Sequence, residues 1–311
     1  MKKPIKFTGI VMITFILMVG IFVVGVGAEG FRGNNEPPND NTPSNNEDVS
    51  NHNPSKSPIQ DENSSEGEEV IEIIGEVNDN PDEEKIPLDE GKVVFLTFDD
   101  GPTKLTPLVL EVLEEKEVKA TFFTLGKLIE RNPEILKETQ EAGHSILPHS
   151  YSHDYAIYST LESFYEDFYK AEEALTKALG TYPPPIFRFI GGSSNHSSFE
   201  YGGQSFMNIL TADINEKGYY YMDWNIDSGD SKKDTNGNTI KDHVLEASED
   251  KNLIVILFHD TERNTAMLEV LPEIIDFYKA EGYRFKTVEE LSTEEIDKMI
   301  ELRLINRVVN R

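Results

Sequence analysis

The 311-residue sequence contains no cysteine. The chain therefore forms no disulfide bond, and no thiolate is available as a nucleophile or a metal ligand. Any bound metal ion must be held by histidine, aspartate or glutamate. Positive charge is also scarce, because 29 Lys and Arg residues stand against 57 Asp and Glu residues and the formal net charge is −28. Since phosphate backbones are bound by basic surfaces, we expect no nucleic-acid partner.

Charged residues are missing altogether from positions 9–28, which follow Lys2, Lys3 and Lys6. Twenty helical residues span about 30 Å, enough to cross a bilayer, and the lysines would stay in the cytoplasm. We therefore expect residues 1–28 to be a membrane anchor that holds the rest of the chain outside the cytoplasm, facing the cell wall. A cleaved signal peptide followed by secretion is the alternative, because the run ends in small residues before Glu29.

Apolar residues are sparse between positions 29 and 90, where 18 acidic and 3 basic residues give a net charge of −15. Such a segment cannot bury enough apolar surface to fold, so we expect a disordered acidic tether. About sixty flexible residues would reach roughly 45 Å, far enough to carry a membrane-bound domain into a cell wall. A plain solubilising spacer is the other interpretation.

Strand and helix signals alternate from residue 91 to residue 311, which we expect to form the folded domain of the chain. This order is typical of an α/β fold, either a parallel barrel or a doubly wound sheet. In a barrel, chemistry is placed at the carboxyl ends of the strands. Helices are expected at 105–113, 128–143, 161–179, 203–217, 241–249, 265–280 and 288–308. The seven expected strands are 93–98, 120–125, 145–147, 186–190, 219–224, 253–258 and 283–286.

Two adjacent carboxylates, Asp99 and Asp100, follow the first expected strand and precede a Gly-Pro turn. Burying two like charges is costly unless a positive group lies beside them. An Asp pair that caps the next helix is the plainer alternative.

His149 and His153 follow the third expected strand. Histidines four residues apart can share one face of a helical turn, so both rings could reach one ion. With Asp100 as third ligand they would form a triad of two histidines and one carboxylate that leaves coordination positions open. Asp99 would then be free to act as a base. The nearby His144 has a different spacing and is expected to be structural.

Arg188 is a charged residue within an apolar strand, and Asp99 is a plausible partner for it. An arginine that reaches solvent at the strand end is the alternative. Gly191 and Gly192 follow, and glycines suit a close approach of backbone amides to a ligand.

His259 ends the sixth expected strand and could serve as a general acid if a carboxylate orients it. Asp227 and Asp230, which follow the fifth expected strand, are both candidates for that carboxylate. Asp260 could instead orient the loop.

Taken in order, these five motifs resemble the polysaccharide deacetylase family, also called carbohydrate esterase family 4 or the NodB-homology domain, over about residues 92–290. Among its members, the membrane-anchored peptidoglycan N-acetylglucosamine deacetylases are the most similar. The motifs at 97–102, 149–153 and 257–260 match the family fully. The third motif departs at Ile190, where the family has proline, and the fourth at Ser231, where many members have tryptophan. The resemblance implies a distorted (β/α)7 barrel, which agrees with seven strands.

The resemblance also implies a role for each residue. Asp100, His149 and His153 would hold a divalent metal ion, commonly zinc, with cobalt, nickel and manganese as alternatives. Asp99 would be the general base, oriented by Arg188. His259 would be the general acid, tuned by Asp230. The Gly191 amide would stabilise the oxyanion, and the acetyl methyl group would lie in a slot lined by Leu257 and Trp224.

These expectations define a metal-dependent hydrolase that removes N-acetyl groups from amino sugars of a glycan. The anchor and the tether favour peptidoglycan as the substrate. A chitooligosaccharide or exopolysaccharide deacetylase is the alternative enzyme. The departures at Ile190 and Ser231 also leave open a glycan-binding module whose active site has decayed.

Overall fold

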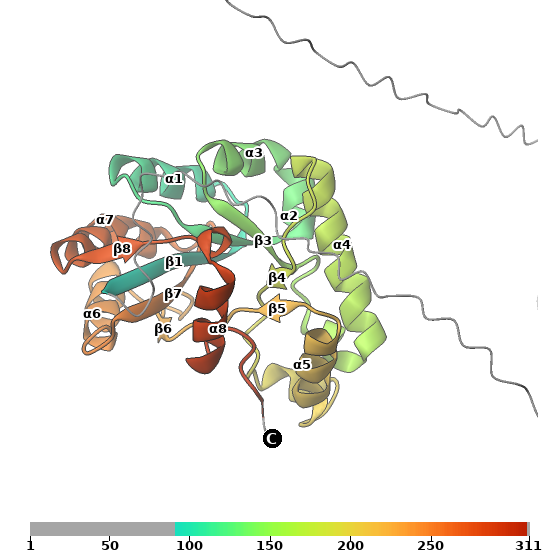
Figure 1. The fold of residues 1–311 in the computed structure, drawn as a ribbon. Coiled ribbons are helices and arrows are strands. Elements are labelled where there is room, and N and C mark those ends of the chain that lie inside the picture. The colour runs from blue at the N-terminus through green and yellow to red at the C-terminus, as the bar shows by residue number, and fades with distance from the viewer. Residues whose placement is uncertain (1–90, 310–311) are drawn as a thin grey trace, which may run out of the picture. The chain divides into compact units, whose positions relative to one another are not determined.

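A computed structural model describes residues 91–309 (Figure 1). The expected anchor and tether lie outside these described residues. Within them, no helix is both long enough and apolar enough to cross a membrane. The helices are α1 (Thr106–Glu115), α2 (Gly126–Arg131), α3 (Pro133–Glu141), α4 (Leu161–Leu179), α5 (Phe206–Glu216), α6 (Gly237–Ala247), α7 (Thr265–Ala280) and α8 (Thr293–Glu301). The strands are β1 (Lys92–Gly101), β2 (Thr121–Leu125), β3 (Ser145–Ser150), β4 (Ile186–Phe187), β5 (Tyr220–Tyr221), β6 (Ile226–Asp227), β7 (Leu253–His259) and β8 (Tyr283–Phe285). Three short 3-10 turns, η1 (Tyr155–Ser159), η2 (Ser197–Glu200) and η3 (Val288–Glu290), complete the elements.

The strands form two parallel sheets. Six strands make the larger sheet, in the order β3-β2-β1-β7-β6, and β8 pairs with the start of β1. β4 and β5 pair with each other. The sheets are joined where the backbone N–H of Arg188 donates to the carbonyl of Pro148 over 3.1 Å. The α/β class and the parallel strands predicted from the sequence are confirmed.

The central strand β1 is buried on both faces, as is usual in parallel sheets. Val94, Leu96 and Phe98 point into a cluster shared with the helices on the outside. Val93 and Phe95 point the other way, into a cluster that collects side chains from β2, β3 and β7. α6, α7, α1, α3 and α4 pack side by side in that order around the strands (Figure 1). Because β1, β2, β3 and β7 are parallel, their carboxyl ends lie at the same edge of the sheet.

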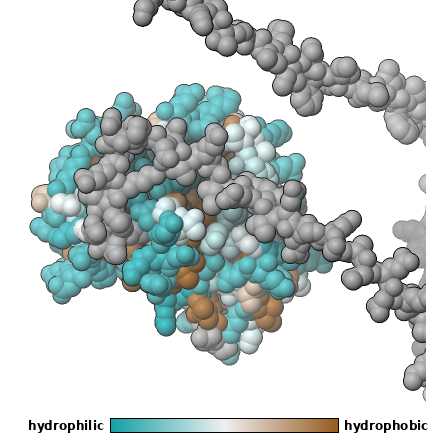
Figure 2. All heavy atoms as spheres, viewed as in Figure 1, coloured by the Kyte–Doolittle hydropathy of each residue, from teal (hydrophilic) through white to brown (hydrophobic). Residues whose placement is uncertain are grey.

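An aromatic cluster surrounds β4 between α4 and α5, and includes Phe164, Phe168, Phe187 and Phe189. Outside it, apolar side chains gather on the surface over α5 and the segment after α8, where Ile209 and Val308 are exposed (Figure 2).

Several expected boundaries were wrong. The helix expected over 128–143 is two helices, α2 and α3, because Pro133 disfavours a helical conformation at Asn132. The strand expected over 219–224 is reduced to β5, and a further strand, β6, follows it. The helix expected over 288–308 is the turn η3 followed by α8, which ends at Glu301. Thr287 and Ser292 each begin a new element with a capping box there.

Candidate active site

A bulge at the end of β1 brings both adjacent carboxylates to one place. Asp99 pairs with Phe123 of β2, and the next paired residue is Gly101, so Asp100 is the extra residue. Its φ is +75°, in the left-handed region. Successive residues of a regular strand point to opposite faces, and the bulge removes that alternation. Both carboxylates therefore lie near the ring of His149, whose Nε2 is 3.8 Å from Asp99 Oδ2 and 3.6 Å from Asp100 Oδ1.

His149 lies on a second bulge, where Thr124 pairs with Pro148 and Leu125 pairs with Ser150. The prediction that His149 and His153 share a helical turn was wrong, because β3 extends to Ser150 and His153 has a φ of +56°.

The chain turns after β3 because Asp167 of α4 binds it. Its carboxylate accepts hydrogen bonds from Ser150 Oγ and from the backbone N–H groups of Tyr151 and Ser152. Ser150 Oγ accepts from the N–H of His153 in turn. These bonds replace those of a helical turn. Asp167 lies on α4, 15 to 17 residues farther along the chain, so no local pattern in the sequence indicated it.

The three expected metal ligands meet. One ligand atom from each of Asp100, His149 and His153 lies within 4.8 Å of the others. His149 Nδ1 donates to the carbonyl of Arg188 over 2.7 Å, which leaves Nε2 available for an ion. Asp100 Oδ1 is buried without a hydrogen-bond partner, although His153 Nε2 lies 3.0 Å away. An orphaned carboxylate oxygen beside two imidazoles fits a divalent metal ion.

The protonation equilibria of the triad also suit a cation. Burial would raise the pKa of Asp100, but the rings of His153 and His149 outweigh it and lower the pKa to about 2. Burial lowers the pKa of His149, although Asp99 and Asp100 oppose this. Burial would lower the pKa of His153 too, but the hydrogen bond and charge of Asp100 raise it. Asp100 and His149 are thus in the forms that bind metal, and His153 must release a proton to bind an ion.

Asp99 lies against Arg188, which is fully buried. Arg188 Nη1 donates to Asp99 Oδ1 and to Thr97 Oγ1, both over 2.8 Å. Its Nε and Nη2 donate to the carbonyls of Met222 and Asp223. Each nitrogen of the guanidinium thus donates a hydrogen bond, and this network fixes the position of the Asp99 carboxylate.

His259 is the register partner of Asp99 on the neighbouring strand β7. Of the two aspartates left open by the sequence, Asp230 contacts it: His259 Nδ1 lies 2.7 Å from Asp230 Oδ1. Asp227 is exposed and accepts from the N–H of Gly229 instead. Burial would lower the pKa of His259, but the hydrogen bond and charge of Asp230 raise it to about 9. His259 is therefore protonated at neutral pH.

Asp260 is fully buried behind the bulge of β1. Its Oδ2 accepts from Thr106 Oγ1 at the start of α1 over 2.5 Å. A Cβ at Gly101 would collide with its carboxylate, so the turn after Asp100 needs glycine. Burial raises the pKa of Asp260 to about 7. Asp260 thus supports the loop, as the sequence suggested.

The loop after Arg188 is fixed by buried packing and by hydrogen bonds. Ile190 is fully buried in the aromatic cluster, and its carbonyl accepts from Tyr158 over 3.0 Å. Asp223 accepts from both the N–H and the hydroxyl of Ser193. Among the described residues, no acceptor is found for the N–H of Gly191, which leaves it able to bind a ligand.

The remaining expected residues are placed as follows. Leu257 of β7 is buried, and Trp224 is half-buried over the Arg188 guanidinium, 5.4 Å from it, with its ring edge against Gly192. Ser231 is exposed.

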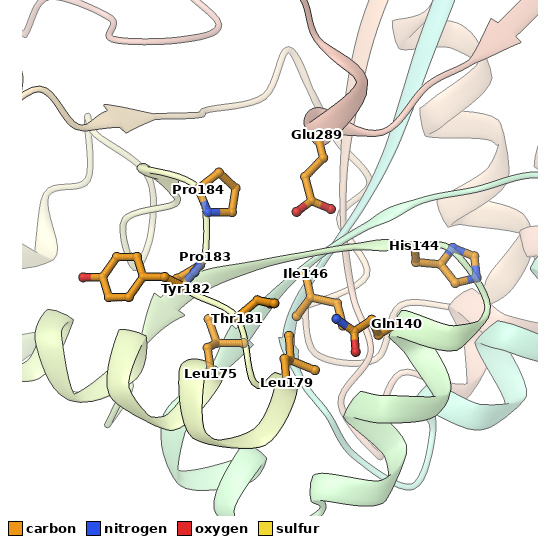
Figure 3. A pocket seen from close by; sticks show the side chains of 10 residues that line it. All are labelled: Gln140, His144, Ile146, Leu175, Leu179, Thr181, Tyr182, Pro183, Pro184 and Glu289. Carbon is orange, nitrogen blue, oxygen red and sulfur yellow. The ribbon is translucent and has the colours of Figure 1, made fainter. Parts of the chain in front are cut away.

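A small pocket lies at the other end of β3, beside α4 (Figure 3). His144 borders it, and its Nδ1 accepts from the N–H of Ala120 over 3.1 Å. Burial, aided by Lys119, lowers the pKa of His144 to about 4. A neutral, hydrogen-bonded ring at this place agrees with the structural role expected for His144.

Comparison with known proteins places these residues in a family context. The family described as polysaccharide deacetylase matches residues 88–205. A peptidoglycan-N-acetylglucosamine deacetylase of Bacillus cereus is 32% identical over 214 residues, which cover 67% of this chain and 91% of that protein. The peptidoglycan-N-acetylglucosamine deacetylase PgdA of Listeria monocytogenes is 31% identical over 206 residues. The match covers 66% of this chain but only 40% of the Listeria protein.

Solved structures agree. The catalytic domain of a peptidoglycan N-acetylglucosamine deacetylase from Eubacterium rectale superposes with a TM-score of 0.60 at 33% identity, covering 65% of this chain and 90% of that one. A CE4 esterase from Streptococcus mutans gives 0.56 at 30% identity, covering 64% and 87%.

Proposed function

This chain belongs to the polysaccharide deacetylase family, and on that premise we propose that it is a metal-dependent hydrolase that removes N-acetyl groups from amino sugars of peptidoglycan. The observation that carries the proposal is the meeting of two separate sets of groups. Asp99 and the triad of Asp100, His149 and His153 lie on one side. His259 lies on the adjoining strand β7 and is paired with Asp230, which follows β6. Amide hydrolysis needs both a base and an acid at one site.

We propose zinc as the ion, held by Asp100, His149 and His153. Two imidazoles and one carboxylate with open positions suit zinc, and cobalt, nickel and manganese accept the same donors. A divalent ion bound there would supply Lewis acidity toward water and the acetyl carbonyl.

The protein's own groups then divide the proton transfers. Asp99, fixed by Arg188, takes a proton from the attacking water. The N–H of Gly191 donates to the acyl oxygen as negative charge develops on it. His259, protonated because of Asp230, gives its proton to the sugar nitrogen as the C–N bond breaks. Acetate and a free amine are released. Leu257 and Trp224 would line the slot for the methyl group.

The proposed substrate is supported by the relatives, and the proposed location by the sequence of the first 90 residues. Relatives named as peptidoglycan deacetylases favour that glycan. The uncharged run 9–28 and the acidic segment 29–90 favour an extracytoplasmic enzyme, anchored in the membrane and tethered toward the cell wall. Secretion after cleavage remains the alternative to the anchor. We also interpret the two sheets as one distorted barrel, because the Arg188–Pro148 bond joins them.

The deciding experiment measures acetate released from purified peptidoglycan and from chitin oligomers, with the zinc-loaded protein and with Asp99→Asn as control. We expect acetate from peptidoglycan, and little from the control. Release from chitin oligomers alone would reassign the substrate. If zinc binds and no glycan releases acetate, the chain is a glycan-binding module and not a deacetylase.

A further inference from the structure

Tyr155 enters the site although no motif pointed to it. It is the first residue of η1, two positions after His153, and it is half-buried. Its ring stands edge-on to the ring of His153, with the centroids 6.2 Å apart and the planes at 78°. The aromatic ring is thus held against one of the proposed metal ligands.

The hydroxyl of Tyr155 lies where a side chain at position 191 would be. A Cβ on Gly191 would lie only 2.8 Å from that oxygen. Gly191 also has a φ of +69°, which other residues rarely adopt. The backbone and the tyrosine together therefore require glycine at 191. The hydroxyl is consequently placed next to the amide that we assign to the acyl oxygen.

The phenol is able to donate. The side chain of Ser197, at the start of η2, interacts with the phenol group. A phenol oxygen can accept from Ser197 and still donate its own proton to a ligand.

We propose that Tyr155 is a substrate-contacting residue whose hydroxyl donates a hydrogen bond to the acyl oxygen, beside the N–H of Gly191. This inference rests on the proposed function for the identity of the substrate. As water adds to the carbonyl carbon, negative charge grows on that oxygen, and two fixed donors stabilise it better than one. Gly191 and Tyr155 come from different loops, so this part of the site is built by tertiary structure.

The test compares Tyr155→Phe with two controls. Tyr155→Phe keeps the ring and removes only the hydroxyl. Tyr151→Phe is the matched control, because that hydroxyl is bonded to Glu130 over 3.0 Å and lies outside the site. Ser197→Ala removes the hydroxyl that interacts with the Tyr155 phenol but leaves the donor. All are prepared with zinc, and zinc content is measured for each.

Two measurements separate this inference from the proposed function. The first is the affinity of acetate for the zinc-loaded protein, by calorimetry, which needs no turnover. The second is kcat/KM on peptidoglycan and on 4-nitrophenyl acetate, which has no sugar.

We expect Tyr155→Phe to bind acetate about fivefold to tenfold more weakly and to lower kcat/KM about 10- to 100-fold on both substrates. Tyr151→Phe and Ser197→Ala should stay within about threefold of the parent protein.

Several results would overturn the inference. Unchanged acetate affinity and kcat/KM in Tyr155→Phe would remove Tyr155 from the site. A loss on peptidoglycan alone would move the contact to a sugar hydroxyl. An equal loss in Ser197→Ala would show that the pair only positions the loop. If the parent protein releases no acetate from glycans while Tyr155→Phe still weakens acetate binding, the proposed function fails and the contact stands.

Discussion

Replacing Arg188 with methionine tests how the buried carboxylate of the proposed base is held. Asp99 and Arg188 are 3% and 0% exposed, and their charged atoms lie 2.8 Å apart. Removing one partner of a buried ion pair leaves an uncompensated charge, which costs about 3–5 kcal/mol. Domains of ordinary stability unfold with about 5–15 kcal/mol, so Arg188→Met should remain folded but be much weakened. With a urea m-value of about 2–3 kcal/mol per molar, the unfolding midpoint should fall by about 1–2 M.

The double variant identifies the cause. Asp99→Asn alone should also destabilise, because it leaves the arginine unpaired. In Arg188→Met/Asp99→Asn neither member of the buried pair carries a charge, so the loss of stability should be smaller than the sum of the two single losses by about 2–4 kcal/mol. Urea unfolding of all four proteins with the metal chelated measures this difference. Additive losses, or a loss below about 1 kcal/mol in Arg188→Met, would mean that the ion pair does not fix Asp99.

Three further expectations concern the metal, the acid and the departure from the family pattern. His149→Ala should abolish zinc binding and activity while the unfolding transition persists, and full zinc content by elemental analysis would contradict the assigned site. Asp230→Asn should lower the pKa of His259 from about 9, and since the acid must be protonated, the rate should begin to fall at lower pH than in the parent protein. A pH–rate profile that does not move would separate His259 from the acid role. Ile190→Pro should keep activity within about tenfold, because no acceptor is found for the N–H of Ile190 among the described residues, so proline breaks no backbone hydrogen bond there. An unfolded Ile190→Pro domain would show that packing of the isoleucine side chain determines this segment.

The sequence predicted which residues lie together in the site, because the carboxyl ends of parallel strands lie at the same edge of a sheet. Asp99, Asp100, His149 and His259 each follow or end an apolar run, and that pattern is enough to bring them together. Local patterns of this kind also predicted α4, whose observed bounds are the expected 161–179.

Sequence could not show how the ligands are turned toward one another. The bulges at Asp100 and His149 depend on strand register, which single-strand patterns do not contain. Asp167 binds residues 15 to 17 positions before it in the chain, and Tyr155 lies against Gly191 of another loop, so no local pattern indicates either contact. A spacing of four residues favoured a helix, and the side-chain bonds of Ser150 and Asp167 stabilised a turn instead.

The carboxylate of Asp167 has a thermodynamic consequence for the binding of an ion. Because it holds the N–H groups of Tyr151 and Ser152 from α4, the segment that carries His153 becomes ordered when the domain folds. The conformational entropy of that segment is therefore lost when the domain folds, and little more is lost when an ion binds. The binding site is thus preorganised. The affinity for an ion is determined by its coordination and dehydration, with little contribution from reorganisation of the chain.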